Sequence, residues 1–375
     1  MNNLERFKRT MEFQKVDHPP LLLDGPWADT WERWYKEGYP KEISMCDYFD
    51  VESLEFKYVG LNTGLYPEIP EKIIKETEDE IIKTDSYGRT VRDLKNSTSM
   101  PEWIDFPVKN KKDLERIIRE YFDLSRINER WPKDWEKNKK EWLDSERKYG
   151  LFLDGGCPYW ILRSLAGVEY SSFLFYDCPE LIDELFEKVN IICIEGLKKV
   201  LPDVKVDYLG FGEDIAYKTS TLISPEMFKT FLLPRYKKVT ELAKSYGLDI
   251  TWYDSDGDLK PFMELYFEVG IHGFAPCEVA AGMEPIELRK RYGKKIQMIG
   301  GIDKREIAKG KEAIRKEVLS KVPKLISEGG YIPKIDHSVS SDISLENYTY
   351  YINLLKEIYK ETKTYERYLG GIIKK

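Results

Sequence analysis

The sequence predicts an α/β protein folded as a single (β/α)8 barrel, of the TIM-barrel class, with an N-terminal extension. A length of 375 residues suits one barrel with insertions. From residue 150 onward, short apolar runs alternate with helical stretches, as parallel strands alternate with helices in barrels. No linker or low-complexity segment interrupts the chain. We therefore expect one domain over 1–375, with 1–110 as N-terminal decoration and the most regular βα repeats in 150–361.

The first part of the chain is less regular. Residues 1–17 predict a short amphipathic helix, and the apolar run 19–25 predicts a strand that ends in Asp24. Residues 26–110 are rich in Trp, Pro and Tyr, so we expect irregular structure there, with short strands near 80–90. The charged stretch 111–148 predicts helices.

The second part supplies most of the expected barrel and brings the count to about eight strands. Ser224-Pro225-Glu226 predicts a helix start, with a capping hydroxyl, a proline at the first position and an acid in the first turn. The strands are expected at 151–156, 208–214, 248–253, 272–276, 296–303 and 330–337. The helices are expected at 159–176, 179–201, 224–246, 258–268, 284–292, 311–328 and 344–361.

Composition excludes several classes of protein. A net charge of −7 argues against non-specific nucleic-acid binding. Five scattered Cys residues without a CxxC pair form no disulfide framework. No signal peptide opens the sequence, and no run reaches the roughly 20 apolar residues of a membrane span. We expect a reduced, soluble, cytoplasmic protein without a nucleic-acid or membrane partner.

A cluster of acids, Asp254-Ser255-Asp256-Gly257-Asp258, directly follows an expected strand. Carboxylates this close repel one another unless a cation, a proton or free access of water relieves the repulsion. A solvated turn explains the run equally well. An EF-hand loop does not, because its sixth and twelfth positions would be Leu259 and Leu265 instead of Gly and Glu.

Acids also stand at the ends of the other expected strands, where barrels place their functional residues. Singly, each acid is explained by a helix cap or a turn. Together they predict a deep, strongly acidic pocket. The strand-end residues are Asp24, Asp154, Glu213, Asp214, Asp254, Asp256, Cys277, Glu278, Asp303, Asp336 and His337.

His337 is one of only three His residues and the only one expected at the catalytic end of the barrel. His18 precedes two prolines, and His272 begins a strand. A lone His is more often hydrogen-bonded structure than a ligand. A His that converges with carboxylates and Cys277 indicates a site for Zn²⁺ or a similar ion.

Other chemistries find little support in the sequence. It contains no Walker loop, no GxGxxG and no GxSxG elbow. Paired carboxylates that cleave glycosides remain a competing class. A non-catalytic or sugar-binding barrel is also open.

Four motifs together resemble one family over nearly the whole chain. They are Glu5-Arg6-Phe7 with Val16-Asp17-His18-Pro19-Pro20, then 222–228, 298–304, and 328–333 with Asp336-His337. The sequence resembles the uroporphyrinogen decarboxylase superfamily and, within it, the corrinoid-dependent methyltransferase branch. The resemblance implies a (β/α)8 barrel.

The chain departs from the decarboxylases of this family. These carry an Arg-rich segment after the first strand, whereas here the segment Asp24–Trp31 has acids and Trp and no Arg. An acidic pocket repels a polycarboxylate. This disfavours tetrapyrrole decarboxylation, and a lyase of decarboxylase type without a metal is kept as the alternative.

The chain also departs from the thiol methyltransferases of the branch, which bind zinc through a His-x-Cys pair and a later Cys. The pair falls on Asp254 and Asp256, and the later Cys falls on His337. Harder ligands suit a Lewis acid that polarises an ether oxygen. The resemblance therefore implies a zinc-dependent O-demethylase that passes a methyl group from a methoxylated, expectedly aromatic, compound to Co(I) of a corrinoid protein.

The resemblance also suggests residue roles. The expected metal ligands are Asp254 or Asp256, Glu278 and His337, with Cys277 as an extra ligand. Glu213 or Asp214 would position substrate or act as a general acid. Four aromatic residues would wall a substrate ring, although core packing explains each of them as well: Trp27, Trp31, Tyr159 and Trp160. A homodimer is compatible with the sequence.

Overall fold

The computed structural model describes residues 1–52, 54–95, 100–144 and 146–362. Residues 363–375 of the predicted single domain lie outside this description. The chain divides into two compact units, and we describe each by itself. Unit 1 holds Met1–Glu55, Lys148–Gly150 and Gly273–Lys375; unit 2 holds Phe56–Arg147 and Leu151–His272. The single-domain prediction stays a prediction.

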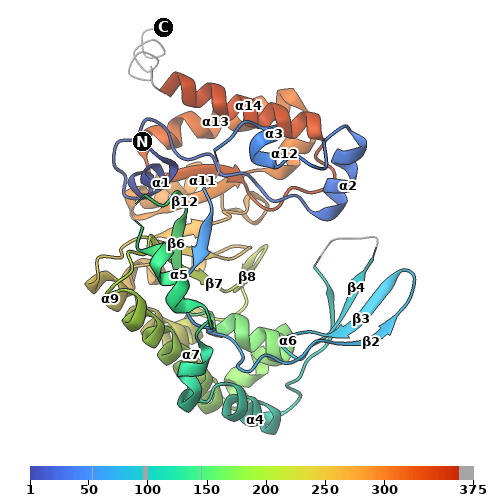
Figure 1. The fold of residues 1–375 in the computed structure, drawn as a ribbon, viewed down its shortest axis with the longest axis vertical. Helices are drawn as coiled ribbons and strands as arrows, with labels where there is room; N and C mark the ends of the chain where they lie inside the picture. The colour runs from blue at the N-terminus through green and yellow to red at the C-terminus, as the bar shows by residue number, and fades with distance from the viewer. Residues whose placement is uncertain (53, 96–99, 145, 363–375) are drawn as a thin grey trace. The chain divides into compact units, whose positions relative to one another are not determined.

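Unit 2 contains a sheet in the order β1-β6-β7-β10 (Figure 1). The central strand β7 pairs in parallel with β6 and with β10. Side chains alternate between the two faces of a strand. Leu151, Leu209 and Tyr253 are accordingly buried on one face. The strands are β1 (Phe56–Tyr58), β6 (Gly150–Asp154), β7 (Tyr208–Gly212) and β10 (Thr251–Asp254).

Helices follow the strands of unit 2 where the sequence predicts them. Helices α6 and α7 each begin with a proline, whose missing N–H costs nothing at a first helical position. The expected helix at 224–246 includes a π-helical segment before Pro234, which cannot donate to the preceding turn. The elements are α4 (Lys111–Tyr121), η1 (Leu124–Arg130), α5 (Trp135–Trp142), α6 (Pro158–Asp177), α7 (Pro179–Val200), α8 (Pro225–Met227), η2 (Phe228–Leu232), α9 (Leu233–Ser245), η3 (Lys260–Phe262) and α10 (Met263–Glu268).

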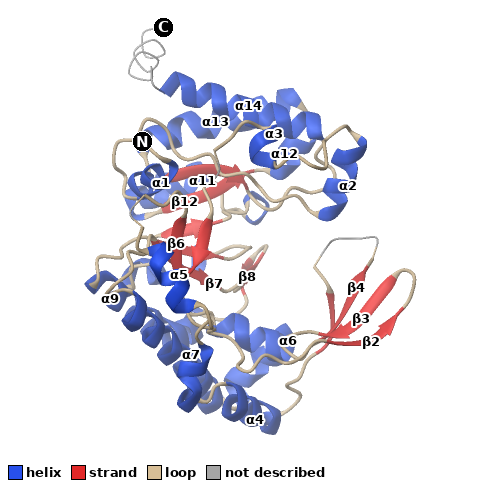
Figure 2. Cartoon of the chain, in the orientation of Figure 1, coloured by secondary structure: helices blue, strands red, loops and turns tan. Residues whose placement is uncertain are grey.

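Unit 2 also carries an antiparallel sheet in the order β2-β3-β4-β5 (Figure 2). The predicted strands near 80–90 are therefore present, but they belong to this sheet and not to a parallel barrel. Its strands are β2 (Lys72–Glu76), β3 (Glu80–Thr84), β4 (Thr90–Leu94) and β5 (Glu102–Asp105). A two-stranded hairpin, β8 (Ala216–Tyr217) with β9 (Ser220–Thr221), follows β7.

Unit 1 contains three neighbouring parallel strands, β11 (Gly273–Ala275), β12 (Gln297–Ile302) and β13 (Tyr331–Ile335). Five of the six residues of β12 are buried, as in a strand covered on both faces. The longer helices of the C-terminal part lie where the sequence predicts them. The unit's helices are α1 (Asn3–Met11), α2 (Ala28–Lys36), α3 (Met45–Tyr48), η4 (Val279–Ala281), α11 (Pro285–Tyr292), η5 (Gly293–Lys295), α12 (Lys304–Ala308), α13 (Lys311–Glu328) and α14 (Leu345–Thr362).

Two expectations for the N-terminal part are wrong. Residues 19–25 form no strand, and only Pro26 makes a single bridge, to Val339. Pro19 and Pro20 lack the N–H groups that a strand ladder needs. The segment 26–110 is not irregular, because it holds α2, α3 and β1–β5. The α/β class with parallel strands is thus confirmed, while a complete eight-stranded barrel is not. No helix in the described ranges is long and apolar enough to cross a membrane.

Candidate active site

The carboxyl ends of β6, β7 and β10 surround a cavity of about 560 Å³ in unit 2. The same end of the strands carries the functional residues in barrel enzymes. The lining residues are Tyr58, Leu61, Asn62, Thr63, Gly64, Tyr87, Phe152, Asp154, Cys157, Tyr208, Gly210, Phe211, Gly212, Trp252 and Asp254.

Four aromatic rings from adjacent strands form one side of this cavity, and we call them the aromatic band: Tyr58, Phe152, Tyr208 and Trp252. The rings of Phe152 and Tyr208 stack with centroids 5.2 Å apart and 5° between their planes. Tyr208 lies 5.2 Å from Trp252, and Phe152 lies 5.4 Å from Tyr58. Side-by-side rings of this kind offer an apolar surface that suits a flat ligand.

Two glycines on the central strand leave room between two carboxylates. Asp154 pairs with Gly210 across β6 and β7, and Asp254 pairs with Gly212 across β10 and β7. A β-carbon at 210 would lie 3.3 Å from the Tyr208 ring, and one at 212 would meet only the sulfur of Cys157, at 4.0 Å. Larger side chains at these positions would occupy the cavity.

Asp154 is a half-buried carboxyl at the end of β6. It accepts hydrogen bonds from the Thr63 hydroxyl at 2.5 Å and from the N–H of Gly156 at 2.8 Å. Burial raises the pKa of Asp154, and the Thr63 hydrogen bond opposes that shift in part. An acid that keeps its proton to higher pH beside a cavity is suited to donate that proton to a ligand.

The acids of the run after β10 make different contacts. Asp254 lines the cavity. The N–H of Asp256 donates to the Asp214 carboxylate at 3.3 Å. Asp258 accepts from the N–H of Lys260 at 3.0 Å, which is the capping role expected of a turn residue. Gly257 has a positive φ of 90°, and a β-carbon there would lie 2.6 Å from a backbone nitrogen of Tyr217.

Glu213, a predicted catalytic residue, is completely buried and does not line the cavity. It accepts hydrogen bonds from the N–H of Trp160 at 2.7 Å and from the Tyr236 hydroxyl at 2.5 Å. Burial raises the pKa of Glu213 to about 8. Trp160 lies in the first turn of α6, so Glu213 satisfies an orphan donor there and ties β7 to α6 and α9. Its catalytic role stays a prediction.

Three further predicted residues of unit 2, Asp214, Tyr159 and Trp160, also lie outside the cavity lining. Asp214 accepts from a guanidinium nitrogen of Arg163 at 3.3 Å, and the same guanidinium lies 4.7 Å from the ring of Trp160. Tyr159 is completely buried, with its ring 6.5 Å from that of Phe175. These contacts match the packing interpretation, and the substrate-binding roles of Tyr159 and Trp160 stay predictions.

In unit 1, Asp336 fastens the loops at the strand ends. It is 1% exposed and accepts hydrogen bonds from the N–H of Val279 at 2.9 Å and of Lys304 at 3.0 Å. These donors follow β11 and β12, respectively. The ring of His337 stacks on Trp27 with centroids 5.9 Å apart.

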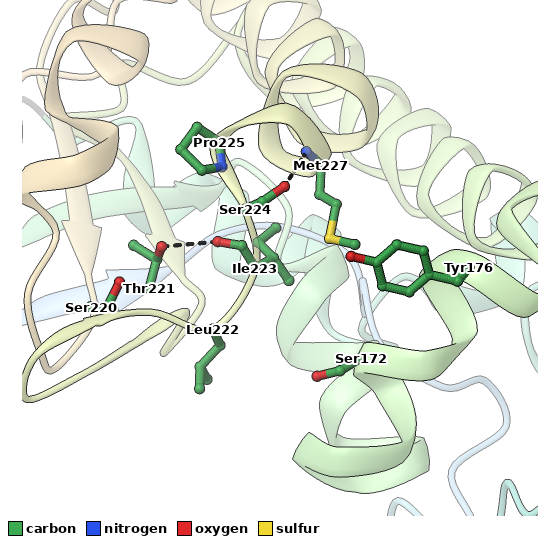
Figure 3. Close-up of a pocket in the computed structure, with 9 residues that line it drawn as sticks. All are labelled: Ser172, Tyr176, Ser220, Thr221, Leu222, Ile223, Ser224, Pro225 and Met227. Atoms are coloured by element: carbon green, nitrogen blue, oxygen red, sulfur yellow. Dashed lines mark hydrogen bonds between the residues drawn. The ribbon is translucent and has the colours of Figure 1, made fainter.

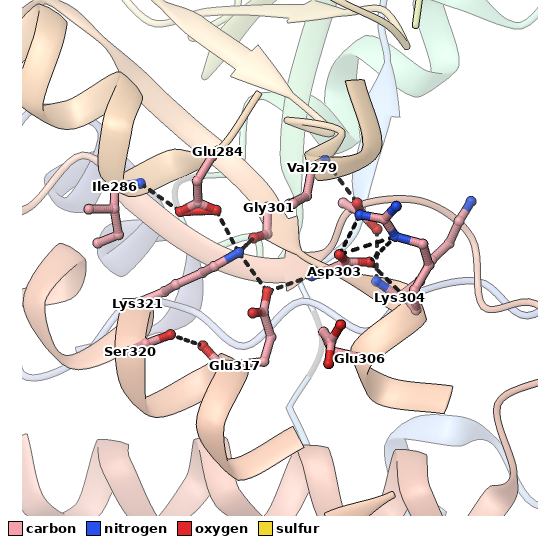
Figure 4. Close-up of polar contacts among 12 residues, drawn as sticks. Val279, Glu284, Ile286, Gly301, Asp303, Lys304, Glu306, Glu317, Ser320 and Lys321 are labelled. Carbon is pink, nitrogen blue, oxygen red and sulfur yellow. Dashed lines mark hydrogen bonds and ion pairs between the residues drawn. The ribbon is translucent and has the colours of Figure 1, made fainter. Parts of the chain in front are cut away.

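A buried cation strengthens the same region (Figure 4). The ammonium of Lys321 pairs with Glu284 at 2.7 Å and with Glu317 at 2.6 Å. Glu317 also accepts from the N–H of Asp303 at 2.9 Å. Asp303 in turn caps α12 through the N–H of Arg305, as the simple interpretation of that residue predicts.

The metal prediction draws on both units. Asp254 and Asp256 belong to unit 2, whereas Cys277, Glu278 and His337 belong to unit 1. Burial raises the pKa of the Cys277 thiol to about 12, which disfavours the thiolate that a metal binds. Within the described ranges, no three or more His, Cys, Asp or Glu side chains are grouped to hold an ion. The zinc site stays a prediction, and no step below depends on it.

Two further predicted positions lie in unit 1. Trp31 belongs to α2, where its ring contacts Trp34 at 5.6 Å and Tyr35 at 5.7 Å. Asp24 is buried with the Lys334 ammonium 3.8 Å away, and burial raises the pKa of Asp24 to about 7.

A second hollow of unit 2, of about 330 Å³, lies between α6 and residues 220–227 (Figure 3). Its hydroxyls serve the backbone: Thr221 donates to the carbonyl of Ile223 at 2.9 Å, and Ser224 accepts from the N–H of Met227 at 3.1 Å. No carboxyl or thiol lies among its described lining residues. We therefore place the candidate active site in the larger cavity.

The comparisons agree with a barrel-type α/β fold. A methyltransferase from Methanosarcina mazei superposes with a TM-score of 0.57 over 96% of this chain and 100% of its own, at 16% sequence identity. A sequence profile of the uroporphyrinogen decarboxylase (URO-D) family matches residues 155–358, which is more than half of the chain. The chain therefore belongs to the uroporphyrinogen decarboxylase family, as its motifs predict. No curated protein sequence matches it.

The sequence predictions of site residues count Asp154 among the strand-end acids of the pocket but give it no role, and they omit Thr63 and the two glycines of β7. Asp154 has a visible signal, since an acid followed by two glycines ends an apolar run. Gly210 and Gly212 recur with the strand period of two, which marks one face left without side chains. Thr63 has no local signal, because its partner is 91 residues away in the sequence.

Proposed function

We propose that this protein transfers a methyl group from a methoxylated aromatic compound to Co(I) of a corrinoid partner protein. One observation carries the proposal: an aromatic-walled cavity holds a carboxyl whose pKa is raised by burial, Asp154, with open space beside it. Membership of the URO-D family and a fold shared with a methyltransferase support it.

Binding would use the aromatic band. A ring laid along Phe152, Tyr208 and Trp252 gains offset or edge contacts and loses its apolar hydration. The space over Gly212 would receive the methoxy group, since a β-carbon there would meet only the Cys157 sulfur, at 4.0 Å.

The chemistry would be a nucleophilic displacement at the methyl carbon. The O–CH₃ bond breaks, its electron pair stays on the ether oxygen, and the two electrons of Co(I) form the new bond to carbon. Asp154 would give its proton to the oxygen, so that a neutral phenol leaves. A positioned general acid contributes about 10²–10⁴-fold to such a step.

Thr63 and Gly156 would hold the carboxyl of Asp154 in place through their hydrogen bonds. A divalent metal on the predicted ligands Asp254, Asp256, Cys277, Glu278 and His337 would add a Lewis acid at the ether oxygen. The proposal keeps that site as a separate hypothesis. Metal analysis of chelator-free protein tests it directly.

The alternative, decarboxylation of a polycarboxylate, needs cations to bind the substrate. None of the residues that line the described cavity is Lys or Arg. The lining instead contains Asp254, whose negative charge repels carboxylates.

The test supplies the protein with 2-methoxyphenol and free cob(I)alamin under anaerobic conditions. The cobalt spectrum reports the methylated product, and chromatography measures the released dihydroxybenzene. We expect turnover by the native protein and a loss of about 10²–10⁴-fold in Asp154→Asn, which keeps the shape and removes the acid.

Asp249→Asn is the matched control, since Asp249 is exposed just before the opposite end of β10. It should leave turnover unchanged. Release of carbon dioxide from uroporphyrinogen, without methyl transfer from any methoxyarene, would establish the alternative and refute the proposal.

A further inference from the structure

We infer that the methyl donor of this cavity is an uncharged methoxyphenol and that carboxylated methoxyarenes are rejected. The inference rests on the proposed function and specifies its substrate class. Three features of the cavity carry it: the charges on its walls, the direction of its hydrogen-bond donors, and the spacing of its carboxylates.

The cavity offers no positive charge to an anion. Asp254 carries the negative charge of the lining, since Asp154 keeps its proton for the ether oxygen, and none of the described lining residues is Lys or Arg. Arg130 lies behind the loop 61–64, but its guanidinium donates to the carbonyls of Asn62, Gly64 and Tyr121 at 2.6–2.9 Å. That cation is committed to shaping the loop.

Three donors of the lining are directed to other protein atoms. The Thr63 hydroxyl donates to Asp154 at 2.5 Å, and the Tyr58 hydroxyl donates to the carbonyl of Leu61 at 2.5 Å. The Asn62 amide donates to the carbonyl of Leu65 at 3.3 Å. A ligand carboxylate needs several donors to replace its water, and burying it without them is costly.

The acceptors of the lining suit a phenol instead. Asp154 and Asp254 stand on strands on either side of β7 and pair with Gly210 and Gly212, two residues apart, so their backbones are roughly 12 Å apart. A benzene ring fits between them, so a hydroxyl on the ring can donate to Asp254 while the ether oxygen faces Asp154. With the ether oxygen at Asp154, a carboxylate at the far end of the same ring would approach Asp254, whose negative charge repels it.

The experiment is a competition in one vessel between three donors: 2-methoxyphenol, 4-hydroxy-3-methoxybenzoate and 4-hydroxy-3-methoxybenzyl alcohol. The alcohol matches the benzoate in size but is uncharged. With cob(I)alamin as acceptor, we expect both neutral donors to be used at least tenfold faster than the benzoate. Comparable rejection of the alcohol would overturn the inference, because size and not charge would then decide.

Two variants separate the cause. Asp254→Asn should reduce the preference over the benzoate several-fold, and a competition ratio is independent of any general loss of activity. Asp249→Asn removes the same charge outside the cavity and should keep the native ratio. An unchanged ratio in Asp254→Asn would overturn the inference.

The outcomes also distinguish this inference from the function it rests on. Equal or faster use of the benzoate by the native protein refutes the inference and leaves methyl transfer intact. A preference for the benzoate that appears on adding zinc refutes it as well, because a bound cation would then set the charge of the site. Failure of all three donors refutes the proposed function itself.

Discussion

The strand ends of unit 2 and unit 1 carry the same kind of residue in opposite settings. In unit 2, Asp154 stands beside a cavity that two glycines keep open. In unit 1, Asp336 is 1% exposed and holds two loops by their N–H groups. An acid at a strand end can therefore line a ligand cavity or hold neighbouring loops. Which role it has depends on whether the neighbouring positions leave room for a ligand.

The largest effect on turnover should come from filling the cavity of unit 2. Gly212→Leu would place a side chain where a β-carbon meets only Cys157 at 4.0 Å, so the chain tolerates it while the cavity fills. We expect methyl transfer to fall more than about 100-fold, since a small misplacement of substrate already costs that much. Turnover and thermal unfolding are the measurements.

Gly212→Ala is the control and should lose far less activity, because a single methyl fits the space. A fully active Gly212→Leu protein with native thermal stability would place the active site elsewhere.

Asp336→Ala should destabilise the strand-end loops of unit 1. It leaves the N–H groups of Val279 and Lys304 buried without their acceptor. Each such loss costs about 1–3 kcal/mol, so the free energy of unfolding should fall by about 2–6 kcal/mol. Urea unfolding measures it, with the exposed Asp342→Ala as the control. A loss no larger than that of the control would contradict the fastening role.

The pH dependence of the free energy of unfolding should show whether Glu213, a buried acid that follows β7, keeps its proton in the folded protein. Its pKa is about 8 in the folded protein and near 4.5 when unfolded, so only the folded state binds the proton between these values. The contribution of Glu213 to the free energy of unfolding is therefore complete below pH 4.5. It is lost as the pH rises to about 8, by at most about 1.4 kcal/mol per pH unit. The measurement compares urea unfolding of the native protein and Glu213→Gln across this range. If the native protein instead became more stable relative to Glu213→Gln as the pH rises, the pKa of Glu213 would be lowered and not raised in the folded protein.

The smallest effect belongs to Asp258, the capping member of the acidic run. Asp258→Ala removes the acceptor for the N–H of Lys260 and should cost about 1 kcal/mol. Turnover should stay native, because Asp258 does not line the cavity. A clear drop in turnover would mean that the acidic run acts as one catalytic group.

Local sequence predicted much of the fold, for a physical reason. The strands β6, β7 and β10 to β13 are apolar runs bounded by Gly, Pro or acids, and those signals lie within a few residues. The strand expected at 19–25 is absent, since two prolines outweigh the apolar run. The strands near 80–90 were found, but their sheet was not, because pairing depends on residues farther along the chain.

For the candidate site, too, local sequence signals predicted some residues, whereas contacts between distant parts of the chain hid others. Asp254 was predicted because the acidic run is local, and it does line the cavity. The burial of Glu213 could not be read from the sequence, because it depends on Trp160 and Tyr236 from other elements. The role of Thr63 was hidden for the same reason, since its contact with Asp154 spans distant parts of the chain.

The division of the chain into units bears on how the protein is made. Residues Met1–Glu55 leave the ribosome before Gly273–Lys375, the segment that completes their unit. At 5–20 residues per second, synthesis of the intervening stretch takes roughly 10–40 s. During that interval the apolar side chains of Leu21, Leu22 and Trp34, all buried in the finished fold, have no completed core to enter. The nascent N-terminal segment is therefore the part of this protein that most needs shielding by a chaperone.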